Sequence, residues 1–142
     1  MEWEKAGGYQ MDNEWALLYQ EACRLQGEVK ISKFLKIKGV ACALMTSKGN
    51  IYTGVSLASA CAAGMCAERN AISSMLTNGE VEIAKIIAVK DDGKIISPCG
   101  VCRECMRQLG DYSKNIEVMI SDYEIKKLCE LTSEWWGEQV DE

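Results

Sequence analysis

The hydrophobic residues of this chain follow two spacings, one typical of helices and one typical of strands. Over residues 12–27, apolar side chains recur three and four positions apart. They lie between an Asp-Asn pair that can cap a helix and a glycine that can end one, which predicts an amphipathic helix. Residues 40–46 and 51–55 are short apolar runs joined by a Ser-Lys-Gly-Asn turn, a pattern typical of a β-hairpin.

Helices and strands alternate through the second half of the chain. Helical spacing returns at residues 66–76 and 102–109, and the runs at 83–89 and 116–120 are typical of buried strands. Residues 123–129 alternate weakly and fit either an edge strand or a last helix. The order helix-strand-strand-helix-strand-helix-strand predicts an α/β fold whose sheet is covered by helices on both faces.

Length and charge narrow the classes of protein that this pattern can represent. With 142 residues we expect one domain, residues 1–142, in which the helix at 12–27 precedes a core at 40–130. A net charge of −5 disfavours a nucleic-acid groove, and no apolar run reaches membrane-spanning length. Residues 1–10 lack the apolar core of a secretion signal, so we expect a cytoplasmic protein without a membrane or nucleic-acid partner.

The chain contains no histidine and eight cysteines. The lack of histidine excludes Ser-His-Asp and Cys-His triads and the HExxH class of zinc site. Reducing compartments rarely keep structural disulfides, so clustered thiols in a cytoplasmic chain indicate metal binding or redox chemistry. A catalytic metal site in this protein would therefore be built from sulfur and oxygen ligands.

Two short segments place thiols where a loop or strand should give way to a helix. They are Cys-Ala-Glu-Arg at residues 66–69 and Pro-Cys-Gly-Val-Cys-Arg at residues 98–103. Helix N-termini carry partial positive charge and free N–H groups, which favour the thiolate. Thiolates from Cys66, Cys99 and Cys102 would hold one Zn²⁺ at roughly 2.3 Å each and leave the fourth tetrahedral position for water, as in catalytic zinc sites.

Glu68 follows the first of these thiols by two residues, so its carboxyl could reach that water without binding the metal. Two other interpretations remain open. Cys61 or Cys105 could complete a four-thiolate site, which would make the zinc structural. Alternatively, the Cys-x-x-Cys pair at 99–102 could be a thioredoxin-like redox pair, although such a pair normally follows the first strand of a βαβ unit.

Cys-x-Glu followed by Pro-Cys-x-x-Cys resembles the signature of zinc deaminases. From residue 40 to residue 135 the chain resembles the cytidine deaminase superfamily, and within it the small all-cysteine branch of blasticidin S deaminases and homotetrameric cytidine deaminases. The hairpin at 40–55 resembles that of blasticidin S deaminases. The resemblance implies a three-layer α-β-α sandwich around a mixed five-stranded sheet. It also implies a homotetramer (or homodimer) and a small cytosine nucleoside as the substrate.

The resemblance also assigns roles to residues at matching positions. It makes the three thiols the zinc ligands, and it makes Glu68 the carboxyl that passes a proton from water to ring N3 while C4 loses ammonia. Arg69 would hydrogen-bond the ligand sulfurs and offset their negative charge. The backbone of Ala67 would contact the pyrimidine.

Two positions depart from the pattern where the family binds the sugar. Cytidine deaminases have Gly-x-Asn-x-Glu after the second strand, whereas this chain has Ser56 and Ala58 at the Asn and Glu positions. We expect both residues to adjoin the substrate. A pocket that hydrogen-bonds a sugar selects strongly for it, and here the amide and carboxylate that would do so are missing. Ordinary cytidine is therefore a doubtful best substrate. The small residues at 58–64 either line a roomier sugar pocket or allow close chain packing.

Two further features have two interpretations each. Trp135 and Trp136 either anchor a solvated C-terminus or close a pocket on this or a neighbouring subunit. The lysines between residues 30 and 38 form either a solvated face or an anion-binding patch. Glu104 stands where the family usually has glutamine, one turn into a predicted helix, and we expect it not to touch the substrate.

Overall fold

The computed structural model describes residues 12–140, and its centre is a sheet of seven strands. β2 pairs antiparallel with β1, β3 and β4, whereas β4 pairs antiparallel with β5 and parallel with β6. β7 follows β6 as an antiparallel neighbour, so the sheet is mixed. The strands are β1 (Val29–Lys30), β2 (Leu35–Thr46), β3 (Ile51–Ser59), β4 (Ile83–Lys90), β5 (Ile95–Ile96), β6 (Glu117–Ser121) and β7 (Glu124–Lys127).

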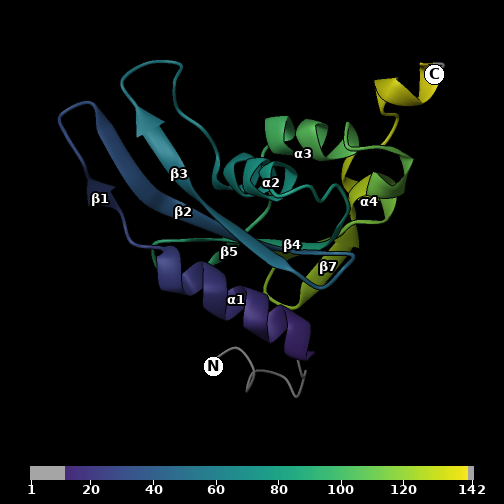
Figure 1. The fold of residues 1–142 in the computed structure, drawn as a ribbon, viewed down its shortest axis with the longest axis horizontal. Coiled ribbons are helices and arrows are strands. Elements are labelled where there is room, and N and C mark those ends of the chain that lie inside the picture. Colours follow the sequence, from purple (N-terminus) through teal and green to yellow (C-terminus); the bar gives the residue numbers. More distant parts are fainter. Residues whose placement is uncertain (1–11, 141–142) are drawn as a thin grey trace.

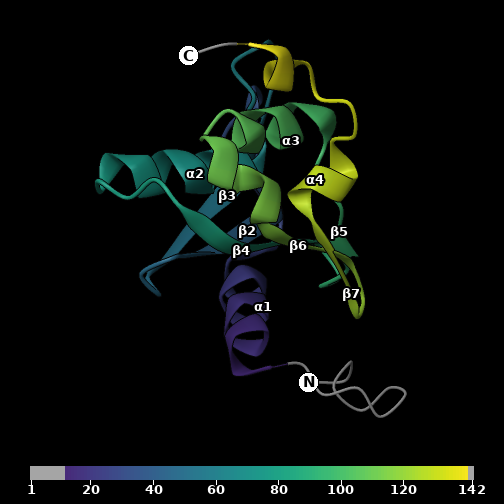
Figure 2. The ribbon, with the colours of Figure 1, turned by 90° about the vertical axis from the view of Figure 1, so that its right-hand side faces the viewer.

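Helices cover both faces of this sheet, as Figure 2 shows most clearly. α1 lies alone against one face, and α2, α3 and the short α4 lie on the other (Figure 1). The expected three-layer α-β-α sandwich is therefore confirmed. The helices are α1 (Asn13–Leu25), α2 (Ala67–Thr77), α3 (Gly100–Arg107) and α4 (Leu128–Leu131), with 3-10 turns at Asp111–Asn115 and Trp136–Gln139.

The expectation of five strands was wrong, because the sheet has seven. β1 and β5 are two residues long and exist only through their pairing with β2 and β4, so no local pattern marks them. β2 and β3 also run beyond the predicted hairpin, at the start of one strand and the end of the other. The ambiguous segment 123–129 contains both an edge strand, β7, and the beginning of α4.

The face under α1 is closed by an apolar stripe and one half-buried cation, Lys85. Asp12 caps the helix by accepting a hydrogen bond from the Trp15 backbone N–H at 2.9 Å. Trp15 and Leu18 pack against the alternate residues of β2 and β4 that point to this face. Lys85 of β4 reaches Glu14 at 2.7 Å, and this contact fixes the start of α1 over the sheet.

On the opposite face, Gly54 of β3 allows α2 to lie directly on the sheet. A Cβ at this position would lie 2.6 Å from the Ala67 carbonyl oxygen and 2.9 Å from the Asn70 carbonyl carbon, so any side chain would force the helix outward. The Asn70 amide donates a hydrogen bond to the Val55 carbonyl at 3.0 Å and ties the same turn to β3. The start of α2, where Cys66 lies, is thereby held against the sheet.

None of the helices within residues 12–140 has the length and apolar character that a membrane crossing requires. The segment 1–10, in which the sequence predicts no secretion signal, falls outside the described residues.

Candidate active site

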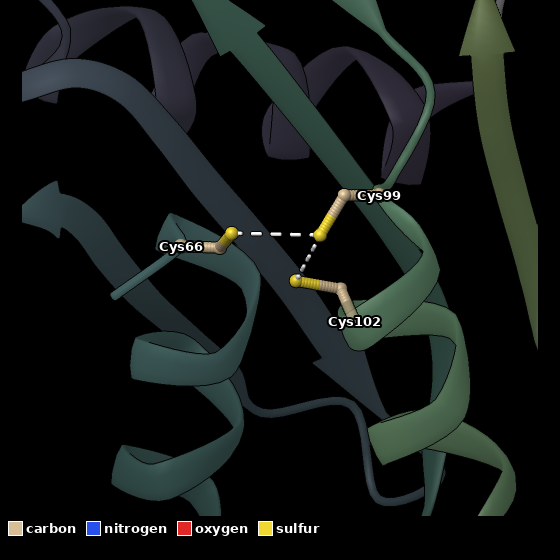
Figure 3. Close-up of side chains that lie close together, drawn as sticks. All are labelled: Cys66, Cys99 and Cys102. Atoms are coloured by element: carbon tan, nitrogen blue, oxygen red, sulfur yellow. Dashed lines mark hydrogen bonds between the residues drawn. The ribbon is translucent and has the colours of Figure 1, made fainter. Parts of the chain in front are cut away.

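Three thiols from two helix starts converge at one point of the molecule (Figure 3). The sulfur of Cys99 lies 3.5 Å from that of Cys66 and 3.5 Å from that of Cys102. All three sulfurs lie within 4.8 Å of one another. Sulfur atoms around a tetrahedral zinc with bonds of about 2.3 Å lie about 3.8 Å apart, so this donor set fits one Zn²⁺ with little rearrangement.

The helix starts explain why these thiols meet. Cys66 is the N-cap of α2 and Cys99 the N-cap of α3, and Cys102 lies in the first turn of α3. Burial opposes ionisation of Cys99, but hydrogen bonds from the backbone N–H groups of Cys102 and Val101 and from the neighbouring thiols outweigh it, so its pKa is lowered. Burial beside Glu68 raises the pKa of Cys102.

Among the described residues, the group of possible metal ligands holds these three thiols and no fourth His, Cys, Asp or Glu. Cys61 is exposed in the loop after β3, and Cys105 is half-buried one turn further along α3. The Cys-x-x-Cys pair shares its site with Cys66 and follows β5, not the first strand of a βαβ unit. The geometry favours a three-thiol metal site over both the four-thiolate and the redox interpretation.

Glu68 lies beside these thiols as the second residue of α2 and is only 4 % exposed. Burial raises the pKa of its carboxyl, and this effect outweighs hydrogen bonds from its own backbone N–H and the Cys102 thiol and the charge of Arg69. A carboxyl whose pKa is raised in this way is a stronger base than an ordinary glutamate, which suits it to take up a proton during a reaction.

Two arginines, one in each cysteine motif, have different partners. Hydrogen bonds to the Cys66 and Cys102 sulfurs raise the pKa of Arg69, so this cation faces the thiol group. Arg103 was part of the quoted motif but had no predicted role. Its Nε donates to the Pro98 carbonyl at 2.8 Å and its Nη2 to the Ser97 hydroxyl at 2.8 Å, which holds the loop that carries Cys99.

A cavity of about 380 Å³ opens over Cys66, Cys99 and Glu68, whereas Cys102 is buried outside its lining. Ser56 and Ala67, both predicted to adjoin the substrate, line it, and the Ser56 hydroxyl accepts a hydrogen bond from the Val40 N–H at 2.9 Å. The third predicted residue, Ala58, is exposed on β3 outside the lining. The whole lining comprises Val40, Ser56, Leu57, Gly64, Met65, Cys66, Ala67, Glu68, Arg69, Ile96, Ser97 and Cys99.

The small-residue segment 58–64 forms a loop that backbone hydrogen bonds between Leu57 and Met65 close at 2.9 and 3.0 Å. Within this segment only Gly64 lines the cavity, and most of the other residues are exposed. Sequence reasoning missed the apolar lining from β2 and β5 and also Ser97. The position of Ser97 directly before the Pro-Cys motif was a signal that could have identified it.

The C-terminal tryptophans lie apart from this cavity. The indole N–H groups of Trp135 and Trp136 donate to the Glu104 carboxylate at 3.1 and 3.0 Å, so this residue serves the C-terminal segment. The Arg107 guanidinium stacks 4.4 Å from the Trp135 ring and pairs with Glu138 at 2.9 Å. In this chain the two rings therefore anchor the C-terminal segment to α3.

The part of the chain that carries the thiols and Glu68 is similar to known proteins. Residues 15–118 match the family described as the cytidine and deoxycytidylate deaminase zinc-binding region. A cytidine deaminase of Sporosarcina psychrophila is 31% identical over 124 residues, which cover 83% of this chain and 88% of that protein. A blasticidin-S deaminase of Bacillus cereus is 31% identical over 90 residues, covering 57% of this chain and 62% of that protein.

Solved structures show the same fold. A cytidine deaminase of Mycobacterium leprae superposes with a TM-score of 0.72 at 23% identity, over 87% of this chain and 100% of that one. A cytidine deaminase of Burkholderia pseudomallei gives 0.66 at 28% identity, over 87% and 98%. Together with the three-thiol group, these matches establish one Zn²⁺ as the cofactor. The chain belongs to the cytidine deaminase family and is a zinc-dependent deaminase.

Proposed function

We propose that the protein hydrolyses the exocyclic amine of a cytosine nucleoside, or of a nucleoside-like antibiotic of the blasticidin S type, to give the uracil form and ammonia. The observation that carries this proposal is the buried carboxyl of Glu68 beside three converging thiols in the floor of a cavity. Zinc held by Cys66, Cys99 and Cys102 would supply the Lewis acidity that activates a water.

Glu68 moves the protons of the reaction. Its carboxylate accepts a proton from water and delivers it to ring N3 as a C4–O bond forms. A second transfer to the exocyclic nitrogen allows the C4–N bond to break, and ammonia leaves. The raised pKa of Glu68 suits this double role, because a carboxylate with an ordinary, lower pKa is a weaker base and would take the proton from water less readily.

Arg69 and the two helix starts offset the charge of the site. Three thiolates around a divalent ion carry a net charge of −1, which weakens the ion as a Lewis acid. Hydrogen bonds from the Arg69 guanidinium to the Cys66 and Cys102 sulfurs withdraw part of that charge. The N-terminal ends of α2 and α3 add their dipoles in the same sense.

The cavity wall binds the substrate. The backbone of Ala67 contacts the pyrimidine at the start of α2, and Ser56 contacts the sugar side from β3. Because the Ser56 oxygen already accepts the Val40 N–H, the hydroxyl proton is the group it offers a ligand. Ala58 lies outside the cavity lining and carries no polar side-chain atom, so we assign it no contact with the sugar.

The alternative substrate is cytidine or deoxycytidine, and the similarity to the Sporosarcina psychrophila cytidine deaminase favours it. In either case the partner is a small molecule and not a nucleic acid, consistent with the net charge of −5. We place this activity in the cytoplasm and in a homotetramer (or homodimer). Sedimentation of the zinc-loaded protein tests the assembly, and a monomer at all concentrations would contradict it.

The test of the activity is ammonia release from blasticidin S, cytidine and deoxycytidine in parallel, with the Glu68→Ala variant as the blank. Turnover of blasticidin S well above cytidine identifies a resistance-type deaminase. Preference for cytidine or deoxycytidine identifies a salvage enzyme. No ammonia from any of the three by zinc-loaded protein would contradict the proposal.

A further inference from the structure

A carboxylate from outside both cysteine motifs lies near Ser56, which lines the cavity, without itself belonging to the lining. Glu28, just before β1, extends its side chain across β2 toward Gly39. A Cβ on Gly39 would lie 3.8 Å from the Glu28 Oε2 atom and 3.7 Å from the Ser56 hydroxyl oxygen. The absent side chain of Gly39 thus leaves one small space that borders both a carboxylate oxygen and a hydroxyl from the cavity wall.

Glu28 and its neighbours share a face of the sheet with Ser56. Lys36 is the cross-strand partner of Ala58, and side chains of directly opposed residues point to the same face. Ser56 is two residues before Ala58 on β3 and therefore points the same way. The Glu28 carboxylate pairs with Lys36 through Oε1 at 3.5 Å. Glu28, Lys36 and Ser56 consequently form a polar rim beside the cavity.

The charges of this rim select a type of ligand. A carboxylate only accepts hydrogen bonds, so Glu28 requires a donor on the ligand. Lys36 balances its charge, and both side chains are about half exposed, at 49% and 55%. A balanced pair gives no net attraction for a cation and favours a neutral donor. The Ser56 hydroxyl proton is the complementary donor, so the rim matches a group that both donates and accepts, as a sugar hydroxyl does.

We propose that Glu28 is a specificity-determining residue that accepts a hydrogen bond from a hydroxyl on the sugar of the nucleoside substrate. This inference rests on the proposed function, and it assigns the substrate class: a cytosine nucleoside whose sugar keeps its ring hydroxyls. Glu28 reaches the site from the segment between α1 and β1, where no motif marks it.

The test compares cytidine with 2′,3′-dideoxycytidine, which lacks the ring hydroxyls, on wild-type protein and on Glu28→Ala and Lys36→Ala. Both substitutions break the same ion pair, but only the first removes the acceptor. A hydrogen bond to a charged group corresponds to about a 10- to 100-fold change in affinity. We expect Glu28→Ala to lower kcat/KM for cytidine by that factor, through KM, and to leave kcat/KM for dideoxycytidine unchanged. We expect Lys36→Ala to keep the preference for cytidine.

An equal loss in both variants, or no loss in either, would overturn the proposal. The binding of uridine and 2′,3′-dideoxyuridine, measured by calorimetry, separates this inference from the proposed function because it needs no turnover. If the protein releases no ammonia but binds uridine with an affinity that depends on Glu28, the proposed deamination is rejected and the sugar contact of Glu28 is supported. Glu21→Gln on α1, which also breaks an exposed ion pair, is the matched control and leaves both measurements unchanged.

Discussion

Two buried carboxyls lie near opposite ends of α2, and their surroundings have opposite effects. Glu68 in the first turn is 4 % exposed, and burial raises its pKa. Glu80, after the last turn, is 7 % exposed, and hydrogen bonds from Tyr52, Thr46 and Asn50 lower its pKa. The Tyr52 hydroxyl donates to Glu80 at 2.6 Å and the Asn50 amide at 3.0 Å.

The difference lies in the balance between burial and hydrogen bonding: loss of solvent dominates at the Glu68 carboxyl, and hydrogen bonds dominate at the Glu80 carboxyl. Glu80 is surrounded by neutral donors that fix it as a carboxylate and tie the β2–β3 turn to the end of α2. Glu68 has thiols and one arginine beside it, and these do not compensate for its burial. One carboxyl is suited to hold the fold, and the other is free to exchange a proton.

The largest expected effect comes from removing one of the thiols, which distinguish the Glu68 end of α2 from the Glu80 end. We predict that Cys66→Ser loses the bound zinc, with a larger drop in affinity than the about 10- to 100-fold that loss of an outer-sphere partner costs. Activity is lost with the metal. Metal analysis of purified protein measures this, and Cys61→Ser, on an exposed thiol outside the group, is the control that keeps one zinc per chain.

The next effect isolates Glu68 from the metal. Glu68→Gln keeps the volume of the side chain but cannot carry a proton, so we predict a loss of kcat by about 10²- to 10⁴-fold. Zinc content stays at the wild-type level. Since the substitution removes a buried ionisable group, whose burial is costly, we expect no decrease in the free energy of unfolding. Ammonia release and chemical denaturation measure the two quantities. Activity retained in this variant would remove Glu68 from the mechanism.

The third effect concerns Gly54, which allows α2 to lie directly on the sheet. Gly54→Ala puts a Cβ into the backbone of α2 at Ala67 and Asn70, and we predict a loss of stability of about 1–3 kcal/mol as the helix moves outward. Because Cys66 and Glu68 move with the helix, zinc affinity falls as well. Gly49→Ala in the turn, where a Cβ meets nothing within 4 Å, is a control for backbone strain alone.

The smallest effect is the pH dependence of stability at the Glu80 end. The lowered pKa means that the folded chain releases this proton more readily than the unfolded one. Its stabilisation is therefore present above the ordinary glutamate pKa and is lost as the pH falls through the folded value. We predict that Glu80→Gln lowers stability at pH 7 but makes little difference in acid. Urea denaturation at both pH values measures this, and equal losses at both would contradict it.

Sequence reasoning located the thiol end of α2 and missed the Glu80 end. Cys66, Glu68 and Cys99 stand in short motifs whose chemistry depends on spacing, and spacing is visible in a sequence. Glu80 acts through Tyr52 and Asn50, which pairing of β2 with β3 brings to it from about thirty positions away.

The same distinction holds for the sheet and the cavity. The long apolar runs of β2 and β4 were predicted, whereas the two-residue strands β1 and β5 depend on distant partners. Ser56 was identified because it stands at the Asn position of the family's Gly-x-Asn-x-Glu pattern. Glu28 was not, because no motif marks it and only the pairing of β1 and β3 with β2 brings its segment near the strand of Ser56.

The central claim is that Cys66, Cys99 and Cys102 hold a catalytic zinc with one open position. X-ray absorption at the zinc edge of the purified protein tests this directly, because sulfur and oxygen neighbours differ in distance and scattering. We predict three sulfurs at about 2.3 Å and one oxygen or nitrogen at about 2.0 Å. Four sulfurs would show a closed structural site and would contradict the account.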